Sequence, residues 1–428
     1  MGTGGGRQLW PRRSQTETAM DQHELDVWHM RRALELALQG QGHVEPNPMV
    51  GCVIVEGAEI IGEGWHRWFG SPHAEIEALA IAGRRARGAT MLVTLEPCCH
   101  WGKTGPCTEA VIAAGVRRVV VAQRDPFAQV DGSGLSALEA AGIEVEVGLL
   151  ASDARQLNAP YLKLLATGRP WVIAKWAMTL DGKLATRSGS SRWISGDQAR
   201  RIAHELRGRV DAILVGAETA RRDDPLLTAR PDVGAETARR DDPLLTARPE
   251  KGSGVFFRNG PEGAPQKRLP TPFPRTATRV VLDSRASLGS ESRLVHTAGD
   301  VPVLVAAGTE AAPSDCQRLE SAGCEVLVCR GGTHRKRLEE LLDELGRRRM
   351  TNILVEGGSR LLGSLLDAGQ IDEVHVFIAP KLVGGRSAPA AIAGQGIEEM
   401  ADALAIDSPQ WKQLGPDLYF SGRVRRGI

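Results

Sequence analysis

Apolar positions along the 428-residue chain follow two periods that alternate. Mostly apolar runs at 49–55, 89–95, 118–121 and 144–147 have the length and composition of buried strands. Between them lie segments with apolar residues at helical spacing, and each ends at or beside a glycine. The alternation predicts an α/β layer sandwich with helices packed on a central sheet. The predicted helices of this first part span residues 26–39, 75–83 and 107–115.

A boundary is expected where this pattern stops, after about residue 150. Residues 154–165 can form a short helix, and the run 167–170 (Thr-Gly-Arg-Pro) is typical of a turn. A second α/β unit then begins at Trp171. The first residues of the chain are rich in Gly and Arg without apolar periodicity, and Met20 is the more natural start. We therefore predict a disordered extension at 1–20, a first domain at 21–150, a linker at 151–169 and a second domain at 170–428.

Composition and charge exclude several classes of protein. Hydrophobic residues make up 42% of the chain, enough for extensive cores, and the formal net charge is +1. A balanced charge and an aromatic content of 4% do not indicate a nucleic-acid-binding face, and no apolar run approaches membrane-spanning length. Seven cysteines in a long chain are typical of a reducing compartment. We expect a cytoplasmic homo-oligomer without nucleic-acid or membrane partners.

Candidate metal chemistry is concentrated in one stretch of the first domain. His73, Cys98 and Cys107 are ligands of the kinds that zinc binds, and three protein ligands leave one position open, as at a catalytic zinc. Two of the three fall at predicted helix starts, where the helix dipole favours a thiolate. Glu75 follows His73 by two residues and is suited to carry a proton between water and a substrate nitrogen.

Other interpretations of this stretch remain open. Cysteines are often small core residues, and a structural zinc module would have four protein ligands and no acid beside the metal. Cys99 and His100 can compete for the metal. We leave both out of the ligand set, Cys99 because adjacent side chains of an extended segment point opposite ways.

The motif resembles the zinc-dependent nucleoside and nucleobase deaminases, whose signature is His-x-Glu followed by Pro-Cys-x-x-Cys. Here the gap between Cys98 and Cys107 is longer, and the run from Pro97 to Cys107 is similar to the deaminase half of the bifunctional riboflavin-biosynthesis deaminase/reductase family. Residues 46–55 and 123–126 agree. The resemblance implies a cytidine-deaminase-like α/β/α sandwich that binds Zn²⁺ and deaminates a pyrimidine, with Asn47 holding the substrate. A nucleic-acid deaminase is the rival interpretation, but it should carry a basic face with interleaved aromatic residues.

The second domain lacks the Gly-x-Gly-x-x-Gly dinucleotide fingerprint. A strand at 352–356, a turn at 357–359 and a helix at 360–368 are predicted instead, and amides at that helix start can hold a phosphate, although the junction can equally be only a turn. This half resembles the reductase half of the same family, whose fold is like that of dihydrofolate reductase. The resemblance implies NADPH as cofactor and a small pyrimidine nucleotide as substrate, whose ribosyl side chain is reduced to ribityl.

The resemblance also implies two sets of contacts in this domain. Arginines suit a phosphate because they bind it bidentately, although Arg207 and Arg230 can also be interpreted as solvated surface charges. The implied substrate contacts are Ser191, Arg207, Leu227, Arg230 and Glu356. The implied cofactor contacts are Ala177, Trp193, Thr219, Asp223, Ser284, Gly358, Ser359, Arg360, Leu361, Leu362, Gly363 and Ser364.

One segment of the second domain occurs twice. Residues 215–231 are repeated without change at 233–249, which indicates a recent tandem duplication, because architectural repeats need several diverged units. We assign the contacts to the first copy, which continues the strand predicted at 211–215, and expect the second copy to extend a loop at little entropic cost. The rival assignment uses Leu245 or Arg248 of the second copy, because that copy is the one connected to the remainder of the domain. A third possibility is a deaminase whose reductase half is disabled.

Overall fold

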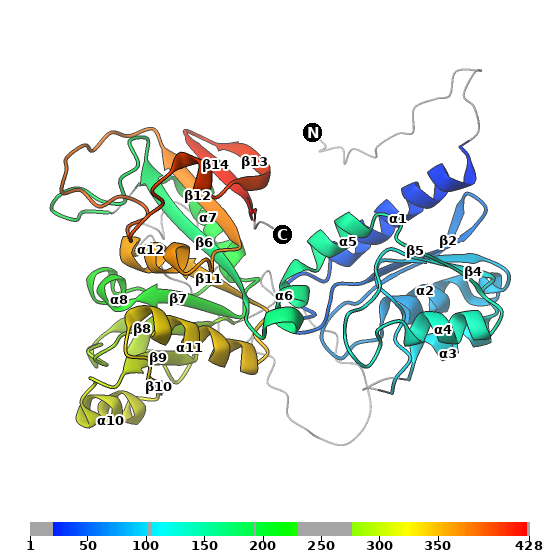
Figure 1. The fold of residues 1–428 in the computed structure, drawn as a ribbon, viewed down its shortest axis with the longest axis horizontal. Helices are drawn as coiled ribbons and strands as arrows, with labels where there is room; N and C mark the ends of the chain where they lie inside the picture. The colour runs from blue at the N-terminus through cyan, green and yellow to red at the C-terminus, as the bar shows by residue number, and fades with distance from the viewer. Residues whose placement is uncertain (1–19, 102–104, 192–193, 230–275, 426–428) are drawn as a thin grey trace, which may run out of the picture. The chain divides into compact units, whose positions relative to one another are not determined.

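The computed structural model describes residues 20–101, 105–191, 194–229 and 276–425 (Figure 1). They form two compact units. The first unit holds the chain up to residue 157 and the second the chain from residue 158, except that residues 40–49 and 68–70 group with the second unit. The predicted extension at 1–20 lies outside the described residues, apart from Met20.

The first unit is built on a five-stranded sheet in the order β2-β1-β3-β4-β5. Strand β1 is antiparallel to both neighbours, whereas β3, β4 and β5 run parallel. The four strands that the apolar runs predict are confirmed as β1, β3, β4 and β5, within two residues at each end. The strands are β1 (Gly51–Glu56), β2 (Glu59–Trp65), β3 (Thr90–Val93), β4 (Arg118–Val121) and β5 (Glu144–Val147).

Helices cover both faces of this sheet. One hydrophobic core lies under α2 (Ala74–Ala82), α3 (Cys107–Ala114) and α4 (Ser133–Ala140). A second core lies on the opposite face under α1 (Gln22–Leu38) and α5 (Ala151–Leu157). The arrangement confirms the expected α/β/α sandwich. Helix α1 begins four residues earlier than the apolar stripe predicts, because Asp21 and Glu24 cap its first turn.

Strand β2 is absent from the sequence prediction, and the reason is two glycines that interrupt its apolar pattern. A Cβ added at Gly62 would lie 2.4 Å from Ala78 O, and one at Gly64 would lie 2.2 Å from Ala74 O. Helix α2 therefore approaches β2 so closely that only glycine fits. This close approach places the start of α2, with His73 and Glu75, directly on the sheet.

The second unit is built on a nine-stranded sheet in the order β10-β9-β8-β7-β11-β6-β12-β14-β13. The strands from β10 to β12 run parallel, and the hairpin of β13 and β14 adds antiparallel strands at one edge. The strands are β6 (Trp171–Thr179), β7 (Ala212–Gly216), β8 (Thr278–Leu282), β9 (Val303–Gly308), β10 (Glu325–Cys329), β11 (Asn352–Glu356), β12 (Glu373–Ala379), β13 (Ile406–Leu414) and β14 (Asp417–Val424).

This sheet also has a core on each face. Helices α11 (His334–Arg347) and α12 (Ser359–Asp367) cover one face. Helices α7 (Asp197–Arg207), α9 (Arg293–His296) and α10 (Pro313–Ser321) cover the other. The region predicted as a linker is helical, with α5 in the first unit and α6 (Ala159–Thr167) opening the second. In the described part of the chain, none of the helices has both the length and the apolar character needed to span a membrane.

Candidate functional site

Three segments of the first unit bring the predicted zinc ligands together. His73 immediately precedes α2, Cys98 lies on the turn that follows β3, and Cys107 is the first residue of α3. Thr108 ties the last two segments, because its N–H and its hydroxyl both donate to the carbonyl of Cys98, at 3.2 and 3.4 Å. Strand β3 thus places Cys98 next to His73 and Cys107, which lie at the starts of α2 and α3.

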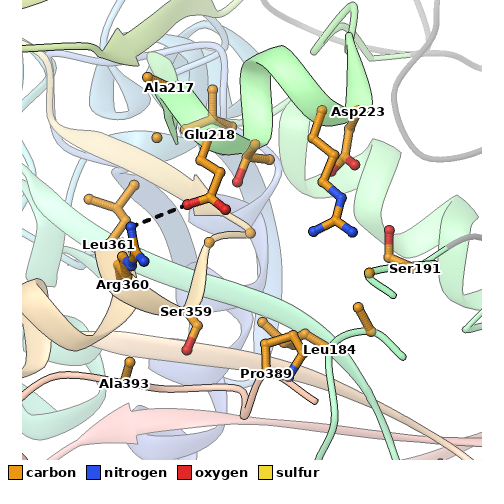
Figure 2. A pocket seen from close by; sticks show the side chains of 18 of the residues that line it. Leu184, Ser191, Ala217, Glu218, Asp223, Ser359, Arg360, Leu361, Pro389 and Ala393 are labelled. Atoms are coloured by element: carbon orange, nitrogen blue, oxygen red, sulfur yellow. Dashed lines mark hydrogen bonds and ion pairs between the residues drawn. The ribbon is translucent and has the colours of Figure 1, made fainter. Parts of the chain in front are cut away.

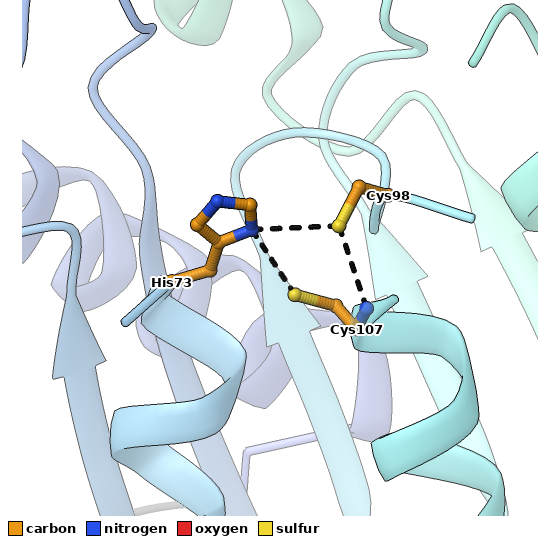
Figure 3. Close-up of side chains that lie close together, drawn as sticks. All are labelled: His73, Cys98 and Cys107. Carbon is orange, nitrogen blue, oxygen red and sulfur yellow. Dashed lines mark hydrogen bonds between the residues drawn. The ribbon is translucent and has the colours of Figure 1, made fainter. Parts of the chain in front are cut away.

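The geometry of the three side chains fits one metal ion (Figure 3). His73 Nδ1 lies 3.2 Å from Cys107 Sγ and 3.4 Å from Cys98 Sγ, and the three ligand atoms all lie within 4.8 Å of one another. Tetrahedral zinc with bonds of about 2.0–2.3 Å separates its ligands by roughly 3.5 Å, so the spacing is suitable. Cys99 is not part of this group, and its Sγ faces the carbonyl of Gln129 at 3.8 Å.

The electrostatics of the group favour a metal-binding thiolate. A hydrogen bond from Cys107 lowers the pKa of the Cys98 thiol to about 4, and a further one with His73 acts in the same direction against the effect of burial. The pKa of the Cys107 thiol is raised, because it holds the proton that it shares with Cys98. One sulfur of the pair is therefore charged at neutral pH, which is the form that binds a metal.

Glu75 lies beside this group, in the first turn of α2. The residue is 3% exposed, and its Oε2 has no hydrogen-bond partner in the part of the chain that the structure describes. Burial raises the pKa of Glu75. An unsatisfied buried carboxylate oxygen is costly and indicates a missing partner, such as a water or a substrate group. The donor set and this oxygen together fit a zinc ion with an open position.

Asn47 is the predicted substrate contact of this half. It is half-buried, and its backbone N–H donates to the carbonyl of Val44 at 3.0 Å. The segment that carries it, residues 40–49, groups with the second unit. The role of Asn47 stays a prediction.

The second unit holds a cavity of about 1140 Å³ (Figure 2). Residues of the parallel strands β6, β7, β8 and β11 line it, together with α8 (Ala217–Asp223) and the start of α12. Ligands of open α/β sheets bind at the carboxyl ends of the strands, so the position is an expected one. Figure 2 shows the Glu218 and Arg360 side chains joined by an ion pair at 3.4 Å, with Ser191 and Asp223 elsewhere on the wall.

Most of the residues predicted to contact cofactor or substrate line this cavity, and five described ones do not. Trp193 and Arg230 lie outside the described residues. Arg207, Leu227, Leu362, Gly363 and Ser364 are not on the wall. The predicted residues that line it are Ala177, Ser191, Thr219, Asp223, Ser284, Glu356, Gly358, Ser359, Arg360 and Leu361.

The junction of β11 and α12 has the predicted strand, turn and helix. Gly357 and Gly358 have φ of 67° and 75°, which favours glycine, and a Cβ at Gly358 would lie 3.1 Å from Thr219 Oγ1. Gly363 faces elsewhere, since a Cβ there would lie 2.1 Å from the carbonyl of Ala393. The turn is therefore confirmed, and phosphate binding at it stays a prediction.

A buried charge cluster adjoins the cavity. The Arg207 guanidinium donates to both carboxylate oxygens of Glu356, at 2.5 and 2.8 Å, and Lys175 Nζ lies 3.5 Å from Oε2. Although burial alone would raise it, the charges of Arg207 and Lys175 lower the pKa of Glu356 to about 2. Burial lowers the pKa of Lys175. The interpretation of Arg207 as a solvated surface charge is wrong, because the residue is 1% exposed and its charge is paired.

The first copy of the duplicated segment is attached to the body of the second unit. Asp224 Oδ1 accepts from the N–H of Arg293 at 2.8 Å, and the carbonyl of Leu226 accepts from Arg279 at 3.3 Å. The carbonyl of Thr228 accepts from Arg207 at 3.4 Å. Leu227 is 1% exposed and packs in the core. The second copy, with Leu245 and Arg248, lies outside the described residues.

Lys175 is a residue of this site that the sequence prediction missed. It lines the cavity and contacts Glu356, although it lies inside the apolar strand β6. A charged residue in such a strand is unusual, and that is the signal that identifies it. The cavity wall has seven Lys and Arg side chains against four Asp and Glu side chains, which favours an anionic ligand.

Two family models match the chain. The RibD C-terminal domain matches residues 170–420, and the cytidine and deoxycytidylate deaminase zinc-binding region matches residues 23–123. The riboflavin biosynthesis protein RibD of Escherichia coli is 39% identical over 393 residues, which cover 92% of this chain and 98% of that protein. RibD of Bacillus amyloliquefaciens is 37% identical over 406 residues, which cover 94% and 97%.

Solved structures agree over nearly the whole chain. RibD of Acinetobacter baumannii matches with a TM-score of 0.75 at 34% identity, covering 95% of this chain and 100% of that one. The diaminohydroxyphosphoribosylaminopyrimidine deaminase/5-amino-6-(5-phosphoribosylamino)uracil reductase of Thermotoga maritima matches with a TM-score of 0.73 at 30% identity and the same coverage. The chain therefore belongs to the RibD family and is a bifunctional enzyme of riboflavin biosynthesis, with a zinc-dependent deaminase domain followed by an NADPH-dependent reductase domain.

Proposed function

We propose that the first unit removes an amino group from a diamino-phosphoribosylaminopyrimidinone, a substrate of the kind named for the Thermotoga maritima relative. The observation that carries this proposal is the group of His73, Cys98 and Cys107 with Glu75 beside it, whose Oε2 has no hydrogen-bond partner among the described residues. These three residues would hold zinc, which when bound supplies a Lewis acid that makes water a nucleophile at neutral pH.

The chain's own residues supply the rest of the reaction. Glu75 would accept the proton of the attacking water and deliver it to the departing nitrogen, so that a C–O bond forms, the C–N bond breaks and ammonia leaves. Its buried environment suits this role, because burial raises the pKa of the carboxyl and brings its two protonation states closer in energy at neutral pH. Asn47 would orient the substrate.

The variant Glu75→Gln tests this assignment. It keeps the size and burial of the side chain but cannot take up a proton, so we expect bound zinc to be retained and ammonia release to be lost. Glu77→Gln is the matched control, because Glu77 lies on the same helix and pairs with Arg67 at 3.2 Å. Ammonia release from the Glu75 variant at near the parent rate would show that another group carries the proton.

For the second unit we infer that the cavity binds NADPH and the deaminated product, whose ribosyl carbon accepts the hydride. The excess of positive charge on the wall supports two phosphorylated ligands, and the buried charge cluster of Arg207, Lys175 and Glu356 adjoins the cavity. The protein's contribution to hydride transfer is to hold the two ligands in register and to exclude water. Among the cavity residues named above, those on α8 and at the start of α12 would bind the cofactor.

We also infer that the first copy of the duplicated segment forms this cavity, because Asp224, Leu226 and Thr228 attach it to the second unit. The chain offers a matched pair of variants, since Asp223 and Asp241 are the same residue of the two copies. We expect Asp223→Ala to lower NADPH oxidation by roughly tenfold or more and Asp241→Ala to leave it unchanged. If NADPH oxidation falls in Asp241→Ala and not in Asp223→Ala, the second copy forms the site. A parent protein that releases ammonia without oxidising NADPH would support the alternative of a disabled reductase.

We further propose that the protein is a cytoplasmic homo-oligomer. All seven cysteines are free thiols, which suits a reducing compartment. Strand β13 forms an edge of its sheet and exposes Trp411, an arrangement that favours pairing with another copy. Light scattering of the purified chain would measure its mass, and a monomeric mass at micromolar concentration would contradict the oligomer.

A further inference from the structure

The carboxylate of Glu96 accepts as many hydrogen bonds as its two oxygens can hold, although the proposed reaction gives it no role. The residue lies two positions before Cys98 and is 4% exposed. Its own N–H donates to the carbonyl of Gln123 at 2.9 Å. Each oxygen of its carboxylate accepts two backbone N–H groups, so that the acceptor capacity is filled. Oε2 accepts from Asp125 at 3.2 Å and Gly132 at 3.1 Å, and Oε1 accepts from Gly134 at 3.0 Å and Leu135 at 3.3 Å.

These four amides belong to one segment that folds over the ligand turn. Residues 124–135 connect β4 to the start of α4, and the carbonyl of Pro97 would lie 2.2 Å from a Cβ added at Gly134. Only glycine permits this approach. The ring centroids of Phe127 and His100 are 6.1 Å apart, so the same segment also lies beside the residues that come after Cys98.

We infer that Glu96 is a positioning residue of the deaminase, whose carboxylate clamps residues 124–135 onto the Pro97–Cys98 turn and thereby fixes the direction of the Cys98 sulfur. A carboxylate that accepts several N–H groups makes strong, directional bonds, and its burial removes the competition of water. The turn has no regular secondary structure of its own to orient Cys98. This inference rests on the proposed deaminase function and adds to it the residue that aims one of the ligands.

The variant Glu96→Gln is a sharp test, because the side-chain NH₂ of glutamine would face two N–H donors at one of the two oxygen positions. Partners that orient metal ligands typically contribute about 10- to 100-fold in metal affinity or activity. We therefore expect ammonia release and zinc affinity to fall by at least roughly tenfold. NADPH oxidation by the same chain, measured with the deaminated product supplied directly, should remain within twofold of the parent, since the second unit is not touched.

A readout that does not depend on the loaded enzyme is hydrogen exchange of the metal-free protein. The amides of Gly132, Gly134 and Leu135 should exchange faster in Glu96→Gln than in the parent, while amides of β3 and β4 keep their protection. The Glu75→Gln variant separates this inference from the proposed function, because it should lose ammonia release without any change in these amides. Glu139→Gln is the control, because Glu139 is an exposed glutamate on α4, the helix that carries Gly134 and Leu135.

Gly134→Ala changes the segment that the Glu96 carboxylate binds. It provides a second test if Glu96→Gln fails to fold. Alanine favours helix more than glycine does, so we attribute a loss to the contacts of the new Cβ with the Pro97 carbonyl at 2.2 Å and with Glu96 Oε1 at 3.1 Å. The same selective loss of ammonia release and zinc affinity is expected. The inference is overturned if either folded variant retains both within twofold, or if NADPH oxidation with the deaminated product supplied directly declines together with ammonia release.

Discussion

The two sites of this chain are assembled in different ways. The zinc ligands come from one stretch of the sequence, and their atoms lie within 4.8 Å of one another at two helix starts and one turn. The reductase cavity is about 1140 Å³, and its wall takes residues from Lys175 to Ala393 on many elements. A metal needs a few atoms in strict geometry, whereas a large anionic ligand needs many weak contacts. A single substitution should therefore abolish activity at the first site, whereas each single substitution should weaken the second site only in part.

The largest effect is expected at a zinc ligand. Cys107→Ser removes a sulfur from a three-ligand group, so zinc binding and ammonia release should be lost by several orders of magnitude, while NADPH oxidation with the deaminated product supplied directly stays at the parent level. Cys99→Ser is the matched control, because Cys99 neighbours Cys98 but lies outside the group. Metal analysis and the two rates measure the outcome. A Cys99 variant as inactive as Cys107→Ser would contradict this ligand set.

The second effect concerns the buried charges beside the cavity. Glu356→Gln leaves Arg207 and Lys175 without a counter-charge, so the unfolding free energy of the second unit should fall by about 3–5 kcal/mol. Glu325→Gln is the control, since Glu325 is 56% exposed in its ion pair with Arg348 and should cost no more than about 1 kcal/mol. Denaturant unfolding followed by circular dichroism measures both costs. Equal costs for the two variants would refute the buried pairing.

The same carboxylate should make the unfolding free energy of the reductase unit fall at acidic pH. The pKa of Glu356 is about 2 in the folded protein against an ordinary value of 4.5, so folding favours the ionised form. Its contribution is present above pH 4.5 and is lost as the pH falls toward about 2, by an amount on the order of 3 kcal/mol. Unfolding free energy measured between these pH values should decline less in Glu356→Gln than in the parent. Parallel pH profiles of the two proteins would show that this group is not responsible.

The smallest effects are expected for single cations on the cavity wall. Arg285 lines the cavity and is exposed, so Arg285→Ala should raise the KM for NADPH by no more than about fivefold and leave kcat unchanged. Arg335→Ala is the control, as an exposed arginine on α11 that does not line the cavity. The difference between the two variants should shrink as salt is added. A loss of kcat in Arg285→Ala would assign this arginine a role in the chemistry.

Local patterns predicted the first unit well. Its buried strands are short apolar runs, and the runs at 118–121 and 144–147 coincide with β4 and β5. The ligand group was also predictable, because each ligand falls at an element end that the sequence marks. Strand β2 was not, since its glycines at 62 and 64 are set by the close approach of α2, which is a tertiary contact.

The strand β11 and the helix α12 of the second unit were predictable, but the side-chain pairings of this unit were not. The bond between Arg207 and Glu356 joins residues 149 positions apart, and no local pattern encodes such a contact. The resemblance implies both residues as substrate contacts, which stays a prediction, and the structure adds their pairing with each other and with Lys175. Leu227, another implied substrate contact, packs in the core with a φ of 52°. Its burial depends on how the loop folds back.

The measurement that tests the bifunctional assignment most directly records two signals from one sample. Purified protein is given the phosphoribosylamino-diaminopyrimidine substrate with NADPH, and ammonia release and NADPH oxidation are recorded separately. Two functional units in one chain predict both signals, with ammonia first and NADPH oxidation dependent on it. Ammonia without NADPH oxidation would contradict the claim and reduce the protein to a deaminase whose second unit is inactive.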